Sequence, residues 1–325
     1  MEPLIIVNFG GPRHLNEVYP FLKALLTDRD VIRTGLPKFL HHLLFTFIAK
    51  TRSKKVGEDY KLIGGGSPIY YDTENLATQL RSRLKRDVVC FHRYLPKTHG
   101  DFLKSIEQFK DKNPIVFPMF PQFTYATTGS IARYFIKNIP AQFTDNLQWI
   151  KSYPDHPKFV AAHAATIRDY CETHQIDLKN SVLLFSAHGL PQKYVDEGDV
   201  YLNECKQSFN AIKDIFPQCQ AYLSFQSKFG KGEWIKPYTN DVCENPPKEW
   251  FGKTVLFIPL SFTSDHIETL FEIEQLYLPE LKKVGIDARR VPALTLRLDW
   301  IQAIEYLIEN TEKFSTTEDL VRKGS

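Results

Sequence analysis

Short apolar runs alternate with amphipathic stretches along the whole chain, and this alternation constrains the fold more than any other feature. Six runs are too short for helices and rich in Val, Ile and Phe, as buried strands are: Leu4–Asn8, Val88–Phe91, Ile115–Phe120, Ser181–Ser186, Ala221–Phe225 and Val255–Leu260. Between them apolar residues recur at helical spacing, as at Val18, Leu22 and Leu26. This pattern predicts an α/β protein with parallel sheets covered by helices on both faces, in which ligands bind beyond the carboxyl ends of the strands.

A break in the alternation divides the chain. The sequence Tyr-Pro-Asp-His-Pro at 153–157 interrupts the periodicity, and each side of it carries its own series of strands and helices. We predict one domain over residues 1–150 and a second over 151–299, which suits a chain of 325 residues. The helical pattern at about 300–312 is expected to pack back on the first domain.

Charge and cysteine usage exclude several classes of protein. Lys and Arg number 41 against 38 Asp and Glu, and this even balance gives no case for nucleic-acid binding. The five scattered cysteines include no C-x-x-C pair, which argues against a disulfide framework and against a compact zinc or iron–sulfur site. No signal peptide and no membrane-spanning run is recognisable, so we expect a cytoplasmic protein.

The segment Leu36–Ile48 is the most amphipathic part of the chain. Seven of its residues are apolar and fall at i, i+3, i+4 spacing, and Lys50, Arg52, Lys54 and Lys55 follow. Three interpretations stay open: a helix facing the core, a lip over an apolar ligand cleft, or a peripheral contact with a membrane.

The loop after the predicted strand Ser181–Ser186 carries a histidine. The sequence Ser-Ala-His-Gly-Leu-Pro at 186–191 places His188 on a short turn, stiffened by Gly and Pro, at the ligand edge of the sheet. A neutral imidazole there could ligate Fe²⁺ or accept a proton. From its position alone, a structural or solvated histidine is the alternative.

The segment Ser261–Leu270, with Glu272 just beyond it, is rich in titratable side chains. A helix beginning at Asp265 would bring Asp265, Glu268 and Glu272 to one face, at i, i+3 and i+7. Carboxylates crowded among apolar neighbours would have at least one pKa raised, so that a proton could be received near neutral pH. His266 adds a further proton or metal group, and the zinc-protease pattern H-E-x-x-H is absent. A solvated acidic first turn is the competing interpretation.

Glycine-rich turns occur at Gly10–Pro12, Gly64–Pro68 and Thr127–Ser130. Neither G-x-x-x-x-G-K-[ST] nor G-x-G-x-x-G is present, so nucleotide binding is weakly supported. Tight turns, or a close approach of the backbone to a flat ligand, suit these glycines better.

Six segments, taken together and in order, resemble the ferrochelatase family over nearly the whole chain. They are Asn8–Pro12, Tyr60–Ile69, Pro121–Phe123 with Thr127–Ser130, Ser186–Pro191, Phe225–Lys228 with Trp234, and Phe262–Leu270. The resemblance implies an enzyme that inserts ferrous iron into a porphyrin as the last step of making haem. It also implies two similar Rossmann-like, doubly wound parallel-sheet domains with the porphyrin cleft between them, and it puts Leu36–Ile48 at the apolar lips of that cleft.

The resemblance assigns roles residue by residue. His188 and Glu268 match the catalytic and iron-binding pair, expected on opposite sides of the macrocycle. Asp265, His266 and Glu272 match the acid–base ridge that supports them. The positions that match the porphyrin pocket are Phe9, Arg93, Tyr94, Ser130 and Trp234.

The chain departs from the family pattern in two places. Leu276 stands where the ridge often carries a third acid, which argues against a second metal-relay site, and the match around residues 91–96 is looser. The cysteine-bearing C-terminal extension of some members is missing. We therefore expect no iron–sulfur cluster and no permanently bound cofactor, with Fe²⁺ as a substrate.

The substrate is predicted to be protoporphyrin IX, because Phe9 followed by two glycines resembles the members that use it. Coproporphyrin III is the alternative within the family. A non-catalytic haem or porphyrin carrier would leave the carboxylates of Asp265, Glu268 and Glu272 without a use, and the apolar segment Leu36–Ile48 argues against a cobalt or nickel chelatase acting on a more polar ring. A partner that delivers iron or receives haem stays open, as does the oligomeric state.

Overall fold

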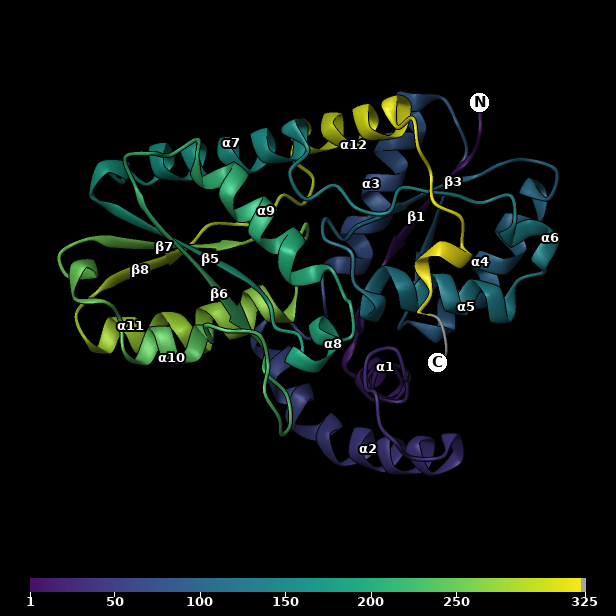
Figure 1. Ribbon diagram of the computed structural model, residues 1–325, viewed down its shortest axis with the longest axis horizontal. Coiled ribbons are helices and arrows are strands. Elements are labelled where there is room, and N and C mark those ends of the chain that lie inside the picture. The colour runs from purple at the N-terminus through teal and green to yellow at the C-terminus, as the bar shows by residue number, and fades with distance from the viewer. Residues whose placement is uncertain (323–325) are drawn as a thin grey trace. The chain divides into compact units, whose positions relative to one another are not determined.

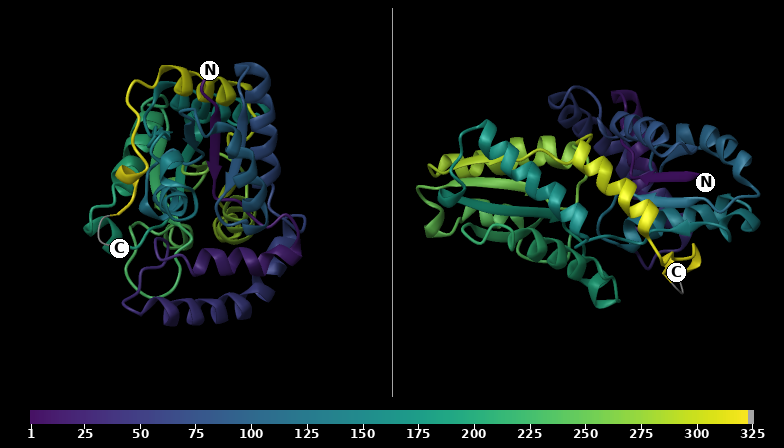
Figure 2. Two further views of the ribbon diagram at one scale, coloured as in Figure 1. Left: turned by 90° about the vertical axis from the view of Figure 1, so that its right-hand side faces the viewer. Right: turned by 90° about the horizontal axis from the view of Figure 1, so that it is seen from above.

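The computed structural model describes residues 1–322, and the chain divides into two units (Figure 1). Unit 1 comprises Met1–Ser152 together with the segment from Ile304 onward, and unit 2 comprises Tyr153–Ala303. Each unit contains a four-stranded parallel sheet with helices on both faces (Figure 1, Figure 2). The predicted α/β class with two doubly wound, parallel-sheet domains is confirmed.

The sheet of unit 1 has the strand order β2-β1-β3-β4. Its strands are β1 (Leu4–Asn8), β2 (Val88–His92), β3 (Ile115–Pro118) and β4 (Gln148–Trp149). Its helices are α1 (Val18–Leu26), α2 (Lys38–Leu62), α3 (Ile69–Leu84), α4 (His99–Ile106), α5 (Ser130–Asn138) and α6 (Ala141–Thr144). A π-helical turn, η4 (Tyr125–Gly129), leads directly into α5. Every residue of β1 is buried, which explains why this central strand is a continuous apolar run.

The sheet of unit 2 repeats this order as β6-β5-β7-β8. Its strands are β5 (Ser181–His188), β6 (Gln220–Gln226), β7 (Thr254–Pro259) and β8 (Asp287–Arg290). Its helices are α7 (Pro157–Thr173), α8 (Gln192–Asp196), α9 (Tyr201–Lys213), α10 (Thr239–Glu244) and α11 (Leu278–Lys283), with the π-helix η7 (Glu268–Tyr277) before α11. The helix α12 (Leu298–Asn310) runs across the boundary into unit 1.

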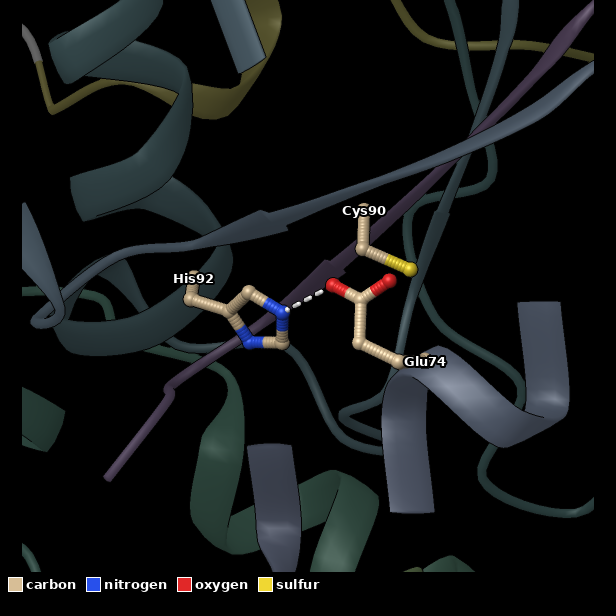
Figure 3. Close-up of side chains that lie close together, drawn as sticks. All are labelled: Glu74, Cys90 and His92. Carbon is tan, nitrogen blue, oxygen red and sulfur yellow. Dashed lines mark hydrogen bonds and ion pairs between the residues drawn. The ribbon is translucent and has the colours of Figure 1, made fainter. Parts of the chain in front are cut away.

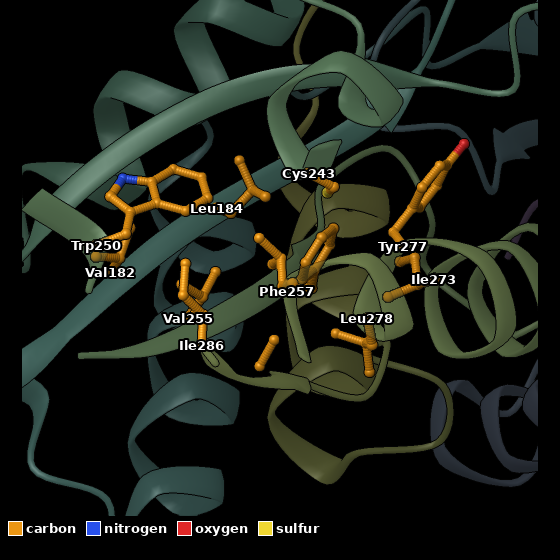
Figure 4. Packing of buried hydrophobic residues seen from close by; sticks show 12 residues of the cluster. Val182, Leu184, Cys243, Trp250, Val255, Phe257, Ile273, Tyr277, Leu278 and Ile286 are labelled. Carbon is orange, nitrogen blue, oxygen red and sulfur yellow. The ribbon is translucent and has the colours of Figure 1, made fainter. Parts of the chain in front are cut away.

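A buried apolar cluster holds η7 against the sheet of unit 2 (Figure 4). Ile273 and Tyr277 of η7 pack with Leu184 of β5 and Phe257 of β7, and none of these four is more than 6% exposed. The rings of Phe257 and Tyr277 are nearly parallel, with centroids 6.4 Å apart. Because the cluster fixes the inner face of η7, it also fixes where the polar side chains of that helix lie.

The helix α2 does not bury its apolar residues as a core helix would. Phe39, Leu43 and Phe47 are 70%, 66% and 65% exposed, whereas Phe45 and Ala49 are buried. We call Phe39, Leu43 and Phe47 the α2 surface. The core-facing interpretation of this segment is therefore wrong for the residues of the α2 surface. Among the described residues, no helix is long and apolar enough to span a membrane.

Candidate active site

The end of β5 holds His188 in a fixed position. The backbone N–H of His188 donates to the Ser261 hydroxyl oxygen at 2.9 Å, and the Tyr201 hydroxyl donates to the His188 carbonyl at 3.0 Å. The next residue must be glycine, because a Cβ on Gly189 would lie 2.7 Å from the carbonyl oxygen of Gln226. These contacts tie the turn to β6 and to the loop after β7, so the imidazole is anchored at the carboxyl edge of the sheet.

The hydrogen bond of the His188 ring determines its tautomer. Nδ1 lies 2.6 Å from the carbonyl oxygen of Gly189, which can only accept, so Nδ1 carries the proton and Nε2 has a free lone pair. Burial lowers the pKa of His188, and the Glu268 carboxylate offsets only part of that shift. The imidazole is therefore neutral near pH 7, and Nε2 can accept a proton or bind a metal ion.

Glu268 and His266 form a largely buried ion pair. His266 Nε2 lies 3.0 Å from a carboxylate oxygen of Glu268, and His266 Nδ1 donates to the carbonyl oxygen of Ser264 at 3.1 Å. Burial alone would raise the pKa of Glu268, but the charge and hydrogen bond of His266, with smaller contributions from His188 and a backbone hydrogen bond, lower that pKa to about 2. Burial likewise opposes the charge of His266, yet Glu268 raises its pKa overall. Glu268 is thus an anion that His266 stabilises.

Glu272 differs from Glu268 in its state of charge. Its Oε2 accepts hydrogen bonds from the Ser227 hydroxyl at 2.5 Å and from Gln226 Nε2 at 3.0 Å. Burial and the nearby Glu268 raise the pKa of Glu272 to about 7, although these two hydrogen bonds lower it. Gln226 Nε2 also donates to the backbone oxygen of Glu268 at 2.7 Å, which links both acids to the end of β6. Glu272 can therefore take up or release a proton at neutral pH.

The helix that carries these acids differs from the one predicted. It begins at Glu268 rather than Asp265, and it is a π-helix of ten residues instead of an α-helix. Asp265 lies outside it and pairs with Arg290 at 2.7 Å, and Arg290 also pairs with Glu274 at 2.7 Å. The predicted face shared by Asp265, Glu268 and Glu272 is thus wrong for Asp265. π-Helical segments are rare in proteins, and those that occur are frequently found at functional sites.

In unit 1, three of the predicted pocket residues surround an aspartate that the sequence did not indicate. Asp28 Oδ2 accepts from Arg93 Nη2 at 2.7 Å, from the Tyr94 hydroxyl at 2.9 Å and from the Ser130 hydroxyl at 2.5 Å. Arg93 Nε donates to the Ser130 hydroxyl at 2.9 Å. The Phe9 ring lies edge-on to Tyr94, with centroids 4.5 Å apart.

Exposure divides these residues into two groups. Tyr94 and Ser130 have no exposed surface, and their hydroxyl groups are directed to Asp28. Phe9 is partly exposed, and 14% of the Arg93 side chain is accessible. Phe9 and Arg93 can touch a ligand, whereas Tyr94, Ser130 and Asp28 hold Arg93 in place.

Trp234 lies beside the turn that carries His188. A Cβ on Gly189 would be 3.0 Å from the Trp234 ring, and Trp234 forms a β-bridge with Pro191. Its side chain is partly exposed, so it can both support the turn and touch a ligand.

The fold and the site together define a two-unit α/β protein whose second unit can accept protons and bind a divalent cation. A comparison with known proteins makes this specific. Residues 2–312 match the family model described as Ferrochelatase. The chain is 45% identical to a ferrochelatase of Chlamydia abortus, over 94% of this chain and 95% of that one, and 42% identical to one of Chlamydia pneumoniae, over 98% and 96%.

The chain belongs to the ferrochelatase family. It is a lyase that inserts ferrous iron into a porphyrin in haem biosynthesis. Among solved structures, SirB from Bacillus subtilis with Fe³⁺ has the same fold, with a TM-score of 0.55 and 11% identity over 97% of this chain and 100% of that one.

Proposed function

We propose that the chain inserts ferrous iron into protoporphyrin IX, and that His188 and Glu268 carry the reaction. One observation supports this above the others: within one unit, the ring of His188 presents a free Nε2, and Glu268 is held as a carboxylate by its ion pair with His266. The imidazole is a base and the carboxylate attracts a cation, and metallation needs both.

The reaction removes two N–H protons from the ring as four ring nitrogens bind Fe²⁺, and the iron stays ferrous. Nε2 of His188 accepts a pyrrole proton, and it can also ligate iron as the metal loses water. Glu268 supplies a negative oxygen ligand that His266 keeps ionised. That the ring lies between the two groups remains a prediction.

Protons leave through Glu272 in this scheme. Its pKa of about 7 lets it take a proton from the site and pass it on at neutral pH. Ser227 and Gln226 hold the carboxyl group in place while its charge changes. Every step uses groups of the chain, so we propose no iron–sulfur cluster or other resident cofactor.

In unit 1, we assign the porphyrin contacts to Phe9 and Arg93, and in unit 2 to Trp234. The aromatic faces suit a flat apolar ring, and the Arg93 guanidinium suits a propionate. Tyr94 and Ser130 act through Arg93 because they are buried and bonded to Asp28.

Anaerobic incubation with Fe²⁺ and either protoporphyrin IX or coproporphyrin III, followed by visible spectroscopy, tests the function. We expect metallation of protoporphyrin IX with the higher kcat/KM. A preference for coproporphyrin III would replace the proposed substrate. Binding of both porphyrins without metallation would contradict the assignment of His188 and Glu268 to catalysis.

Replacing Glu272 with glutamine should slow metallation in a pH-dependent way. Glutamine resembles protonated Glu272, which is the main form in the wild type below a pKa of about 7. We therefore expect little loss near pH 6 and roughly a tenfold loss of kcat near pH 8, where the wild type is ionised. A pH profile of kcat checks this, with Glu280→Gln on α11 as the control. A loss that does not vary with pH would exclude Glu272 as the proton carrier.

The α2 surface is proposed to contact a lipid membrane peripherally. Phe39, Leu43 and Phe47 are exposed at i, i+4 and i+8 on one side of α2, and lysines and an arginine follow at 50–55. Replacing all three with serine should weaken binding to phosphatidylglycerol vesicles, measured by co-sedimentation, tenfold or more. Each Å² of apolar surface that no longer enters the membrane costs about 25 cal/mol of binding free energy. Leu62→Ser, 65% exposed at the other end of α2, is the control. Equal binding of the triple variant and the wild type would contradict the proposal.

A further inference from the structure

Three side chains that can bind metal converge in unit 1, on the face of β2 that packs against α3 (Figure 3). Cys90 and His92 are two residues apart on β2, so they point to the same face of the sheet. Phe91 points to the other face, where its ring packs against Phe102 of α4 and Phe135 of α5. Glu74 reaches the cluster from α3. One ligand atom from each of Glu74, Cys90 and His92 lies within 4.8 Å of the other two.

The three side chains differ in how they are held. The His92 side chain is 1% exposed, and its Nε2 lies 2.9 Å from a carboxylate oxygen of Glu74. The Cys90 thiol donates to the carbonyl oxygen of Thr73 at 3.6 Å. The Glu74 side chain is 43% exposed, so the cluster is open to solvent on the Glu74 side. The arrangement is a pair of donors on a strand with a third donor from α3 beside them.

We propose that Glu74, Cys90 and His92 form a binding site for a divalent transition metal ion of the zinc type. A thiolate, an imidazole and a carboxylate are the donors that zinc takes, and three protein ligands leave a fourth position for water. Ligand atoms around a tetrahedral zinc are roughly 3.5 Å apart. His92 Nε2 and the Glu74 carboxylate are already 2.9 Å apart, and no two of the three ligand atoms are more than 4.8 Å apart, so small side-chain rotations can bring them to this spacing. This site goes beyond iron insertion, and its residues belong to unit 1, whereas His188 and Glu268 belong to unit 2.

Loading the site rearranges two protons. Without metal, Cys90 is a thiol, because burial and the neighbouring Glu74 carboxylate raise its pKa. Coordination forms a sulfur–metal bond and releases that proton to solvent. Nε2 of His92 donates to the Glu74 carboxylate in the metal-free protein, so its proton moves to Nδ1 when Nε2 binds the ion. A cation at the centre offsets the repulsion between the thiolate and the carboxylate. Without the metal ion, nothing in the cluster offsets that repulsion.

The cysteine pattern of the sequence predicted no compact zinc site, and the cluster explains how one can arise without C-x-x-C. The strand supplies Cys-x-His through its alternation of two residues, and the third ligand comes from a helix 16 positions earlier than Cys90. Only the packing of α3 on β2 brings them together.

Titration of the full chain with Co²⁺, a spectroscopic substitute for zinc, tests the proposal. We expect a thiolate-to-cobalt charge-transfer band that saturates at one ion per chain and disappears when Zn²⁺ is added. Cys90→Ser should abolish the band, while Cys219→Ser, a half-buried cysteine of unit 2, should keep it. The candidate active site holds no cysteine, so it contributes no such band.

A second variant guards against misfolding of the first. The Glu74 side chain is 43% exposed, so Glu74→Ala should fold normally by circular dichroism, and its Co²⁺ dissociation constant should rise by at least about tenfold. This affinity is measured in a His188→Ala, Glu268→Gln background, which removes the other cation site. Absence of the band in the wild type, survival of the band in Cys90→Ser, or unchanged affinity in Glu74→Ala would each overturn the proposal.

Discussion

Glutamine in place of Glu268 is expected to lower kcat for iron insertion by about a hundredfold or more. The amide has the same shape, but it carries no charge, cannot take up a proton and is a poor ligand for a hard cation. Because His266 holds the pKa of Glu268 at about 2, the wild-type carboxylate is ionised at every pH used for assay. The loss should therefore be the same across the neutral range, unlike the loss expected for Glu272→Gln.

A control on the same helix separates catalysis from structure. Glu274→Gln changes a carboxylate of η7 that pairs with Arg290, and it should leave kcat nearly unchanged. In Glu268→Gln the pKa of His266 should also fall, because the Glu268 carboxylate is what raises it, and NMR of the imidazole protons measures this shift. A variant in which the pKa of His266 falls while kcat stays near the wild-type value would reduce Glu268 to a structural role.

The inner strands β1, β3, β5 and β7 could be predicted from sequence because burial on both faces makes them largely continuous apolar runs. All six predicted strands exist; the first has the predicted bounds, and the others differ by one or two residues at one or both ends. Two of the four edge strands, β4 and β8, were missed. β4 has two residues, and β8 reads Asp-Ala-Arg-Arg, since an edge strand tolerates charged side chains that a central strand would exclude.

The π-helix could not be predicted, since side-chain periodicity in the sequence is interpreted with the α-helical repeat. The segment after β7 contains acids at i, i+3 and i+7, which fit an α-helix begun at Asp265. In the structure, Asp265 pairs with Arg290 of β8, 25 residues later. Asp265 therefore lies outside the helix and is bonded to a distant strand, which no local pattern in the sequence indicates.

The positions of the candidate residues were more predictable than their surroundings. His188 follows from its place at the end of β5, whereas Arg93 was indicated only by the resemblance to the family. The burial of Tyr94 and Ser130 around Asp28 depends on contacts across 66 and 102 residues, which the sequence does not reveal. The motif at 225–228 was recognised, but its hydrogen bonds to Glu272 were not.

Removing the imidazole of His188 is expected to cost about a hundredfold or more in kcat/KM for metallation, because the variant lacks the base that takes a pyrrole proton. Burial lowers the pKa of His188 below the ordinary histidine value, so the wild-type base stays unprotonated to a lower pH than a solvated histidine would. The metallation rate, which needs unprotonated His188, should therefore fall only at pH values below the ordinary pKa of histidine. His188→Ala should lose this acid limb together with the activity.

Rescue by added imidazole distinguishes a chemical role from a structural one. His188→Ala leaves a space beside Gly189, whose carbonyl oxygen loses its hydrogen-bond donor, and free imidazole can occupy that space and restore part of the rate. His174→Ala, at an exposed histidine just beyond α7, is the matched control and should keep the wild-type rate. If His188→Ala folds, binds porphyrin and metallates it at the wild-type rate, the proton must leave by a route that does not use this imidazole. Partial rescue with a restored acid limb would instead show that a neutral nitrogen base at this position is what the reaction requires.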